Sequence, residues 1–324
     1  MNQTPLISIC IPTYKRSGYL EKCLDNLAHQ LEDSVVKNAV EIVISDNASP
    51  DNTREVVQKF QAKFDNINYF CNETNIGMDG NIMHSITRAT GQYCWNIGDD
   101  DIIQNGALAR AVTILTEKEV ALLTVDFYPY VDIEKSMKNT PILQQPIYET
   151  NAETFYDKGY YQGIFGIAIF KKAEWLKIPR ENLEPYWGYY EIILKMIGTA
   201  TLPLAYTASP LVYIGQDYRW NNGGVALAVR IHCKRMLEKL SGFGYSQAFV
   251  KKEIDILARS LPLTIMSAKS FSLPCTKENL TLMWREFSYY PLQLILATII
   301  FFIPNFFIKI LKSLKQLFNG SNRI

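Results

Sequence analysis

The chain lacks the charge pattern and the histidine clusters that would point to several large classes of protein. Basic and acidic residues nearly balance, 33 against 32, so no overall basic field favours a nucleic-acid partner. Any polyanion must therefore be bound at a local site. The three histidines, His29, His84 and His232, are isolated on helical stretches, and we expect His29 and His232 to be ordinary surface or core residues.

Paired cysteines and a leader-like segment are also missing. The six cysteines lie far apart, and none has the short spacing typical of a zinc ligand set or a redox pair. Four of them fall in apolar segments, which favours buried, reduced thiols. The stretch MNQTPLISICIP has no positively charged region followed by a long apolar one, so it does not resemble a secretory signal. We therefore expect the chemistry to face the cytoplasm.

What the chain does have is a globular composition and an alternating pattern. Of its 324 residues 48% are hydrophobic, enough for a full core in one or two domains. The first part alternates short β-rich runs with helical periodicity, which predicts a Rossmann-like α/β fold with a mostly parallel sheet flanked by helices. Strands are expected at 6–11, 40–45, 67–71, 93–97 and 120–127, and helices at 17–31 with Ser17 as the cap, 56–64, 79–89 and 106–118.

The pattern changes twice further along the chain. Residues 128–160 are rich in polar residues, prolines and tyrosines, which predicts a long loop or lid beside a site. A strand at 163–170, a helix at 189–198 and strands near Leu204 and at 211–214 follow. Beyond Gly223 and Gly224 the pattern is helical. We therefore expect an α/β domain over 1–223, divided into halves 1–127 and 128–223, and a helical region over 224–290.

Residues 291–324 are expected to associate with a membrane. Leu292 to Ile308 is mostly apolar and leads into KILKSLKQLF, in which Lys309, Lys312 and Lys315 lie three apart. The stretch is short for a spanning helix, and one span would separate the lysine-rich tail from the main domain although both suit the cytoplasmic face. An in-plane or re-entrant element bent at Pro304 avoids that conflict. An ordinary core helix is the alternative.

Polar residues follow each of the first four predicted strands. They are PTYKR, SDNASPDNT, NETNIG and GDDD. In an open α/β sheet, ligands bind beyond the carboxyl ends of the strands. Tyr14 offers a stacking face, Asp46 and Asn47 can bond a base or ribose, and Lys15 or Arg16 can approach a phosphate. The pattern predicts a site for a phosphorylated nucleoside.

The run Asp99, Asp100 and Asp101 needs a further explanation. Carboxylates this close repel one another unless a cation neutralises them, and hard oxygen ligands select Mg²⁺ or Mn²⁺. Such an ion prefers to share its coordination sphere with a diphosphate. The alternative is a solvated turn or helix start, where acidic residues are also favoured.

Four ordered segments resemble the landmarks of the bacterial inverting glycosyltransferases of family 2, which have the GT-A fold. They are ISICIPTYKRSGYLEKCLDNLAHQ, EIVISDNASPDNT, NIGMDGNIMHSITRATGQY and GDDDII. The chain is especially similar to the abequosyltransferase-like branch that builds O-antigen and other surface polysaccharides, in which SDNAS replaces the commoner DDGS. The resemblance covers roughly the first 110 residues well.

The resemblance implies roles for residues of the donor site. Pro12, Thr13 and Tyr14 would hold the nucleoside, and Asp46, with Asn47, would touch the base. Asn75 and Gly77, in the loop after the third strand, would complete the nucleotide-sugar site.

The resemblance also assigns the three aspartates. Asp99 would lie near the ribose or diphosphate, Asp100 would ligate the metal, and Asp101 would be a second or outer ligand. The family usually has an acidic residue at the position of Gly98, so the chain departs from the pattern there. That departure leaves open how the aspartates divide these roles.

Inversion requires a general base for the acceptor hydroxyl. In this family the base is an acid at the start of a helix in the second half of the domain, commonly in a Glu-Asp pair. Glu191, in YWGYYEIILK, takes the corresponding place without the pair. The rival candidates are Glu184, Asp157 and Asp217.

The segment QDYRW, residues 216–220, fits the Gln-x-x-Arg-Trp pattern of processive relatives such as cellulose synthases. By that resemblance Arg219 would meet the diphosphate and Trp220 would stack on the acceptor sugar. A loop tryptophan that anchors the domain junction is the alternative.

Together these features predict a metal-dependent inverting glycosyltransferase at the cytoplasmic face of the inner membrane. It would move a sugar from a nucleoside diphosphate-sugar to a lipid-linked, polyprenyl diphosphate glycan in surface polysaccharide synthesis. One alternative is a sugar-nucleotide nucleotidyltransferase, although PTYKRSGY is a poor glycine-rich phosphate loop. The other is a membrane-bound nucleotide- or glycan-binding protein whose catalysis has lapsed.

Overall fold

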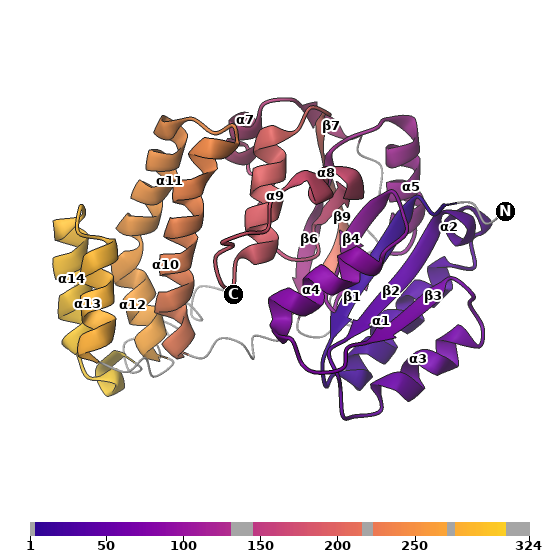
Figure 1. Ribbon diagram of the computed structural model, residues 1–324, viewed down its shortest axis with the longest axis horizontal. Helices are drawn as coiled ribbons and strands as arrows, with labels where there is room; N and C mark the ends of the chain where they lie inside the picture. The colour runs from indigo at the N-terminus through magenta and orange to yellow at the C-terminus, as the bar shows by residue number, and fades with distance from the viewer. Residues whose placement is uncertain (1–3, 131–144, 216–222, 271–275, 309–324) are drawn as a thin grey trace, which may run out of the picture. The chain divides into compact units, whose positions relative to one another are not determined.

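The computed structural model describes residues 4–130, 145–215, 223–270 and 276–308 (Figure 1). The chain divides into two compact units. Unit 1 comprises Met1–Glu181 and Gly188–Asp217, and unit 2 comprises Asn182–Trp187 and Tyr218–Ile324.

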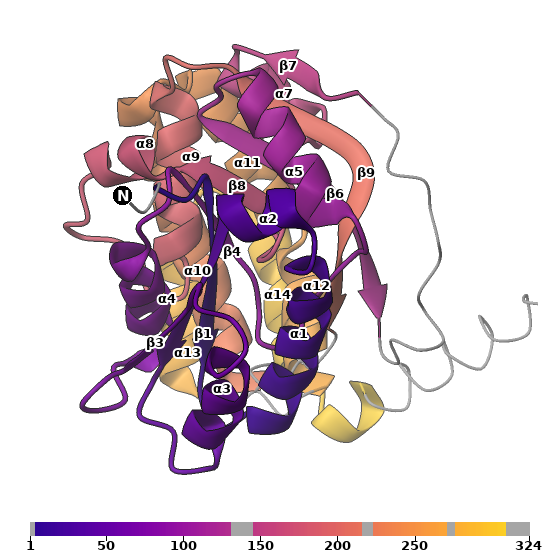
Figure 2. The same cartoon turned by 90° about the vertical axis from the view of Figure 1, so that its right-hand side faces the viewer.

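Unit 1 is built on one mixed β-sheet with the strand order β3-β2-β1-β4-β8-β6-β9-β5, to which β7 adds by pairing with β9 (Figures 1 and 2). The first four strands in this order are parallel, and β8 is antiparallel to both β4 and β6. The strands are β1 (Ile7–Thr13), β2 (Val40–Asp46), β3 (Ile67–Cys71), β4 (Tyr93–Asn96), β5 (Ile102–Ile103), β6 (Leu122–Tyr130), β7 (Ile147–Glu149), β8 (Ala168–Lys171) and β9 (Leu204–Gly215).

Helices cover both faces of the sheet. Right-handed crossovers place the helices after β1 and β2 on one face and the helix after β3 on the other, because the strand order reverses at β1. Every residue of β2 is buried, as expected for a strand covered on both faces. The helices are α1 (Ser17–Gln30), α2 (Ser34–Ala39), α3 (Thr53–Gln61), α4 (Gly77–Arg88), α5 (Ala107–Glu117), α7 (Ala152–Asp157), α8 (Lys172–Lys177) and α9 (Gly188–Thr199).

The described helices of unit 2 begin with α10 and end with α14. They are α10 (Gly223–Lys239), α11 (Gln247–Arg259), α12 (Leu261–Ser270), α13 (Lys277–Glu286) and α14 (Pro291–Phe302), with a 3₁₀ turn at Leu240–Phe243. The segment 182–187 is held to α10 by Glu184, whose carboxylate lies 2.7 Å from both His232 Nδ1 and Lys239 Nζ. Helix α12 packs against α14, where Lys269 Nζ donates to Phe301 O at 2.7 Å.

Several sequence expectations need correction. The region 128–160 is not one long loop, because it contains β7 and α7, although residues 131–144 lie outside the described part. The two strands expected near Leu204 and at 211–214 are one strand, β9. Ser17 is the first residue of α1 and not its cap, and its backbone N–H donates to Asp51 Oδ2 at 3.2 Å. Within the ranges described, no helix has the length and apolarity needed to cross a membrane.

Candidate functional site

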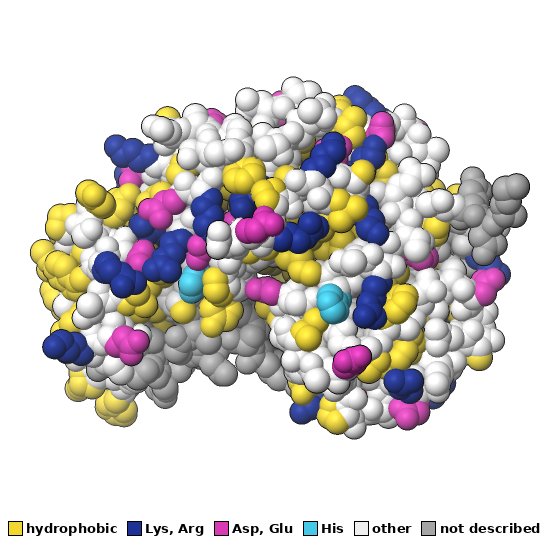
Figure 3. Space-filling model, viewed as in Figure 1, with side chains coloured by type: hydrophobic (Ala, Val, Ile, Leu, Met, Phe, Trp, Pro, Cys, Tyr) yellow, Lys and Arg dark blue, Asp and Glu magenta, His cyan; other side chains and the backbone are white. Residues whose placement is uncertain are grey.

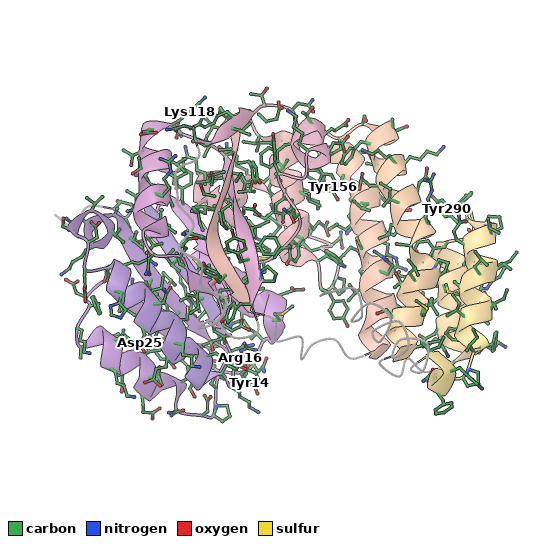
Figure 4. All side chains as sticks on the ribbon, turned by 180° about the vertical axis from the view of Figure 1, so that it is seen from behind. Tyr14, Arg16, Asp25, Lys118, Tyr156 and Tyr290 are labelled. Carbon is green, nitrogen blue, oxygen red and sulfur yellow. The ribbon has the colours of Figure 1, made fainter. Side chains whose placement is uncertain are left out.

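The carboxyl ends of β1, β2 and β4 meet at one edge of the sheet of unit 1. Thr13, the last residue of β1, donates through Oγ1 to Asp99 Oδ2 in the loop after β4, at 2.7 Å. The backbone N–H of Asn47, which follows β2, donates to Thr13 O at 3.0 Å. Three segments far apart in the sequence therefore join in one hydrogen-bonded cluster. Figure 4 shows Tyr14 and Arg16 together at this edge.

Arg16 is the cation of this cluster. Its Nε lies 2.7 Å from Asp99 Oδ1, and its Nη2 lies 2.6 Å from Asp100 Oδ2. The guanidinium also lies over the ring of Tyr19, 4.5 Å from the ring centroid. One side chain thus partly neutralises two carboxylates, which explains how adjacent aspartates can be packed against each other.

Asp101 has a different role from its two neighbours. Its Oδ2 accepts the backbone N–H of Gly98 at 2.7 Å, and its Oδ1 accepts that of Gly215 at 3.1 Å. The carboxylate therefore ties the loop after β4 to the end of β9. A Cβ atom at Gly98 would lie 2.9 Å from Asp100 Oδ1 and 3.1 Å from Asp101 Oδ2, so any side chain there would force the aspartates to move.

Burial sets the electrostatics of the aspartate loop. It raises the pKa of Asp99 to about 6, against the opposing effects of the Arg16 charge and the Thr13 hydrogen bond. It raises the pKa of Asp101 to about 7, and the charge of Asp100 adds to that shift. Both carboxylates would be more stable as anions with additional positive charge nearby.

A second network shapes the loops after β2 and β3. Asn47 Oδ1 accepts from Asn72 Nδ2 at 3.2 Å and from the Ile76 N–H at 2.9 Å. Asn47 Nδ2 donates to Asn75 Oδ1 at 2.9 Å and to Gly77 O at 3.1 Å. The residues Asn47, Asn75 and Gly77, which were predicted for the nucleotide-sugar site, therefore lie together. The pKa of Tyr14 is lowered, and the largest cause is a hydrogen bond with the Asn75 side chain.

Asp46 is buried beneath these loops. Its Oδ1 accepts the Ser49 N–H at 2.9 Å and its Oδ2 accepts the hydroxyl of Tyr69 at 2.6 Å. The residues Lys15 and Ala48, in the loops after β1 and β2, have left-handed backbones with φ of 56° and 60°. Such residues cost about 1 to 3 kcal/mol each and persist where surrounding contacts hold them. Here the Lys15 N–H donates to Ser49 Oγ at 2.9 Å, which joins the two loops.

The start of α9 lies close to the aspartate loop. Burial raises the pKa of Tyr190, and the charge of Asp101 adds to this effect. Next to it in the chain, Glu191 is fully buried, and its Oε1 lies 2.7 Å from Lys195 Nζ, one turn along the helix. The predicted base is thus held in a buried ion pair, and its catalytic role stays a prediction.

The other predicted site residues lie elsewhere. Glu184 belongs to unit 2 and contacts His232 and Lys239, and Asp157 is the last residue of α7. Arg219, Trp220 and Asp217 lie outside the described residues.

Sequence reasoning missed the contacts made by Tyr69, Asn72 and Asn81. Asn81 Nδ2 donates to Ser45 O at 2.8 Å, and its Oδ1 accepts from Ser45 Oγ at 2.8 Å. A polar residue on the sheet-facing side of α4 is the one signal that could have identified it.

The carboxylate oxygens of Asp99 and Asp100 are suitable ligands for a divalent cation. Their oxygens converge on a single positive group within 2.7 Å, and carboxylate oxygens are the ligands that Mg²⁺ and Mn²⁺ prefer. Among the described residues, no three His, Cys, Asp or Glu side chains form a complete protein ligand set. An ion there would need oxygens from a bound diphosphate or from water, as is usual for Mg²⁺.

Comparison with known proteins identifies relatives of this chain. The family model described as Glycosyl transferase family 2 matches residues 8–174, just over half of the chain. Abequosyltransferase RfbV of Salmonella typhimurium is 40% identical over 111 residues, 34% of this chain and 32% of that protein. A GalNAc(5)-diNAcBac-PP-undecaprenol beta-1,3-glucosyltransferase of Campylobacter jejuni is 35% identical over 107 residues, 32% of this chain and 33% of that protein. The chain thus spans about a third of the length of these curated relatives.

Solved structures show that the fold is shared over a longer stretch. Staphylococcus aureus TarS 1-349 superposes with a TM-score of 0.55 at 17% identity, covering 89% of this chain and 90% of that one. The mannosyltransferase PcManGT from Pyrobaculum calidifontis, solved with GDP-Man and Mn²⁺, superposes with a TM-score of 0.52 at 15% identity, covering 92% and 87%.

Proposed function

The chain belongs to glycosyltransferase family 2, and on that basis we propose that it moves a sugar, with inversion, from a nucleoside diphosphate-sugar to a lipid-linked, polyprenyl diphosphate glycan. The observation that carries the proposal is the convergence of Thr13, Asn47 and Asp99 at one edge of a GT-A-like sheet. We also propose that the reaction belongs to surface polysaccharide synthesis, as the resemblance of its sequence segments implies. The name of the Campylobacter relative, which contains PP-undecaprenol, supports a lipid-linked acceptor.

The donor would lie across the loops after β1, β2 and β3. We assign Pro12, Thr13 and Tyr14 to the nucleoside, with Asp46 and Asn47 toward the base and Asn75 and Gly77 completing the site. Tyr14 offers an aromatic face, and its contact with Asn75 joins two of these loops. Complexes of TarS with UDP and UDP-GlcNAc support a nucleotide-sugar at such a site.

The sequence placed Asp99 toward the ribose or diphosphate and assigned Asp100 and Asp101 to the metal. Because Asp99 and Asp100 share one cation in the fold, we propose instead that these two would hold the divalent metal against the diphosphate. A bound Mg²⁺ or Mn²⁺ would offset the negative charge of the departing nucleoside diphosphate. Asp100 is the less buried of the two, which suits direct ligation, while Thr13 orients Asp99 through its hydrogen bond. We assign Asp101 to an outer position, because its two oxygens accept backbone N–H groups.

We propose Glu191 as the base that removes the proton of the acceptor hydroxyl. It lies in the first turn of α9, next to Tyr190, whose pKa is raised by burial and further by the charge of Asp101. Glu191 Oε1 lies 2.7 Å from Lys195 Nζ, which holds the carboxylate in place within the helix. The alternative base, Glu184, contacts His232 and Lys239 in unit 2. Arg219 and Trp220 remain our candidates for contacts to diphosphate and acceptor sugar.

We propose that α14 lies in the plane of a membrane surface, which would bring the enzyme to a lipid-linked acceptor. One face of this helix packs inward through Leu294, Ala297 and Phe301. The opposite face presents an apolar stripe whose side chains are 46% to 64% exposed, namely Leu292, Ile295, Leu296, Ile299 and Phe302. The sequence continues with Lys309, Lys312 and Lys315, which suit anionic headgroups. The cytoplasmic leaflet is the proposed location.

A binding panel tests the donor assignment. The purified chain would be heated with UDP, dTDP, GDP or CDP, each with and without Mn²⁺. We expect one nucleotide to raise the melting temperature in the presence of the metal, because a ligand at 100 to 1,000 times its dissociation constant adds about 2.7 to 4.1 kcal/mol. No stabilisation by any nucleotide, with or without metal, would contradict the proposed donor site.

A further inference from the structure

Arg16 forms its ion pairs with the same carboxylate oxygens that would bind a metal. Its Nε and Nη2 lie 2.7 and 2.6 Å from Asp99 Oδ1 and Asp100 Oδ2, and the three side chains are only 6% to 20% exposed. The second oxygen of Asp99 accepts from Thr13, and both oxygens of Asp101 accept backbone N–H groups. The loop therefore has few carboxylate oxygens to offer a new cation unless Arg16 gives up those it holds.

A guanidinium and a divalent ion cannot share these two oxygens at low cost. Both would lie within about 3 Å of the same atoms, so their positive charges would repel strongly at a partly buried site. Arg16 is the N-cap residue of α1, and its guanidinium lies over the ring of Tyr19, which is 40% exposed, so the side chain is close to solvent on that side. A diphosphate offers it replacement partners, since guanidinium and phosphate form charge-assisted hydrogen bonds in matching geometry.

We propose that Arg16 is an internal counter-cation that exchanges partners during donor binding. Without ligand it neutralises Asp99 and Asp100. When a metal and a nucleoside diphosphate bind, the metal takes the carboxylates and Arg16 turns to the diphosphate. This inference rests on the proposed function for the identity of the ligand, but the competition between Arg16 and a divalent cation does not depend on it.

Two consequences distinguish this exchange from simple phosphate binding by Arg16. First, the metal alone should bind weakly, because it must displace Arg16 before a new partner for the guanidinium is present. Second, metal and nucleotide should each tighten the binding of the other, since the diphosphate receives the displaced guanidinium. An arginine that only contacted phosphate would leave the affinity for the metal alone unchanged.

The test is a titration of the full chain with Mn²⁺ alone. Binding is measured by calorimetry or by the electron paramagnetic resonance signal of free Mn²⁺. The variants are Arg16→Gln, which removes the competing charge, and Arg16→Lys, whose single ammonium cannot span both aspartates. Arg88→Gln is the matched control, because Arg88 also stacks on an aromatic ring of unit 1, that of Phe70, near the far end of α4.

We expect Arg16→Gln to tighten Mn²⁺ binding roughly tenfold, Arg16→Lys to tighten it less, and Arg88→Gln to leave it unchanged. In Arg16→Gln, the factor by which Mn²⁺ and the nucleotide tighten the binding of each other should also be smaller than in the wild type. Unchanged or weaker binding of Mn²⁺ alone by Arg16→Gln and Arg16→Lys would overturn the inference. If Mn²⁺ binding tightens as expected but no nucleoside diphosphate binds, the exchange of cations stands and the donor assignment fails.

Discussion

At the scale of single residues, the aspartate loop shows that neighbours of the same type can have separate tasks. Asp99 and Asp100 share the charge of Arg16, whereas Asp101 accepts backbone N–H groups from Gly98 and Gly215. The sequence could predict that these carboxylates lie at the carboxyl edge of a sheet, because they directly follow a predicted strand. It could not predict which atoms pair, since that depends on side-chain conformations in the folded chain.

The division of tasks predicts opposite effects for two isosteric changes. Asp101→Asn turns one accepting oxygen into an NH₂ group facing an N–H donor, so it should lower the free energy of unfolding by about 1 to 3 kcal/mol. Asp100→Asn should alter stability less but should abolish metal-dependent donor turnover. Urea unfolding and a nucleoside diphosphate release assay measure the two effects. An Asp101→Asn variant as stable as the wild type would show that its carboxylate does not hold the loop.

Buried Asp46 gives a second prediction at this scale. Tyr69→Phe removes the hydroxyl that donates to Asp46 Oδ2, so the carboxylate loses a partner in a place with little access to water. We expect a loss of about 1 to 3 kcal/mol in the free energy of unfolding. Tyr289→Phe is the control, because Tyr289 is 91% exposed and should show no measurable change. Equal stability of the two variants in urea would argue against a structural role for the Tyr69 hydroxyl.

A test of Glu191 as the base must separate an effect on catalysis from an effect on the stability of the fold. Removing it alone leaves Lys195 buried without this partner, which typically costs about 3 to 5 kcal/mol. Replacing both, Glu191→Leu with Lys195→Met, removes the charges together and should restore most of that stability. If Glu191 is the base, the double variant should fold and yet transfer sugar at least about 100 times more slowly. A folded double variant with ordinary transfer rates would remove Glu191 from the mechanism.

At the scale of elements, periodicity predicted most strands and helices of unit 1 but failed where the chain is irregular. β9 was expected as two strands because Ser209 and Pro210 interrupt the apolar pattern. The folded strand accommodates them at two register shifts, one on each side of Asp126, where a proline without an N–H donor can be tolerated. The start of α1 shows the same limit, since the expected cap Ser17 is the first residue of the helix, and its backbone N–H donates to Asp51 from another loop.

The apolar stripe of α14 gives a prediction for an element as a whole. Leu292→Glu with Ile299→Glu places two charges on the exposed face without touching the packed face, so it should prevent sedimentation with vesicles containing anionic lipid. Leu176→Glu on α8 should leave sedimentation unchanged, because Leu176 is a leucine of unit 1 that is also more than half exposed, at 53%. A truncation after Tyr290 should likewise release the chain from vesicles while donor hydrolysis persists. Vesicle binding by the α14 variant at the level of the wild type would exclude this face as the membrane contact.

At the scale of the whole molecule, the likeness to known sequences is concentrated in the first half of the chain. The family match ends at residue 174, and the two curated relatives align over about a third of the chain. This limit has a physical basis, because donor sites reuse the same strand ends and phosphate chemistry whereas acceptor sites vary with the acceptor. The alternation of strands and helices was therefore enough to predict an α/β fold and the edge of the sheet that holds the candidate site. It did not predict that the sheet is mixed, with β8 antiparallel to both β4 and β6.

The most direct test of the central claim is the release of nucleoside diphosphate from a panel of nucleotide sugars by the purified chain. We predict that one donor class is turned over with Mn²⁺ or Mg²⁺, that a chelator stops the reaction, and that Asp100→Asn is inactive although it remains folded. Failure to turn over any nucleotide sugar, together with product formation from a nucleoside triphosphate and a sugar phosphate, would contradict the account and identify a nucleotidyltransferase instead.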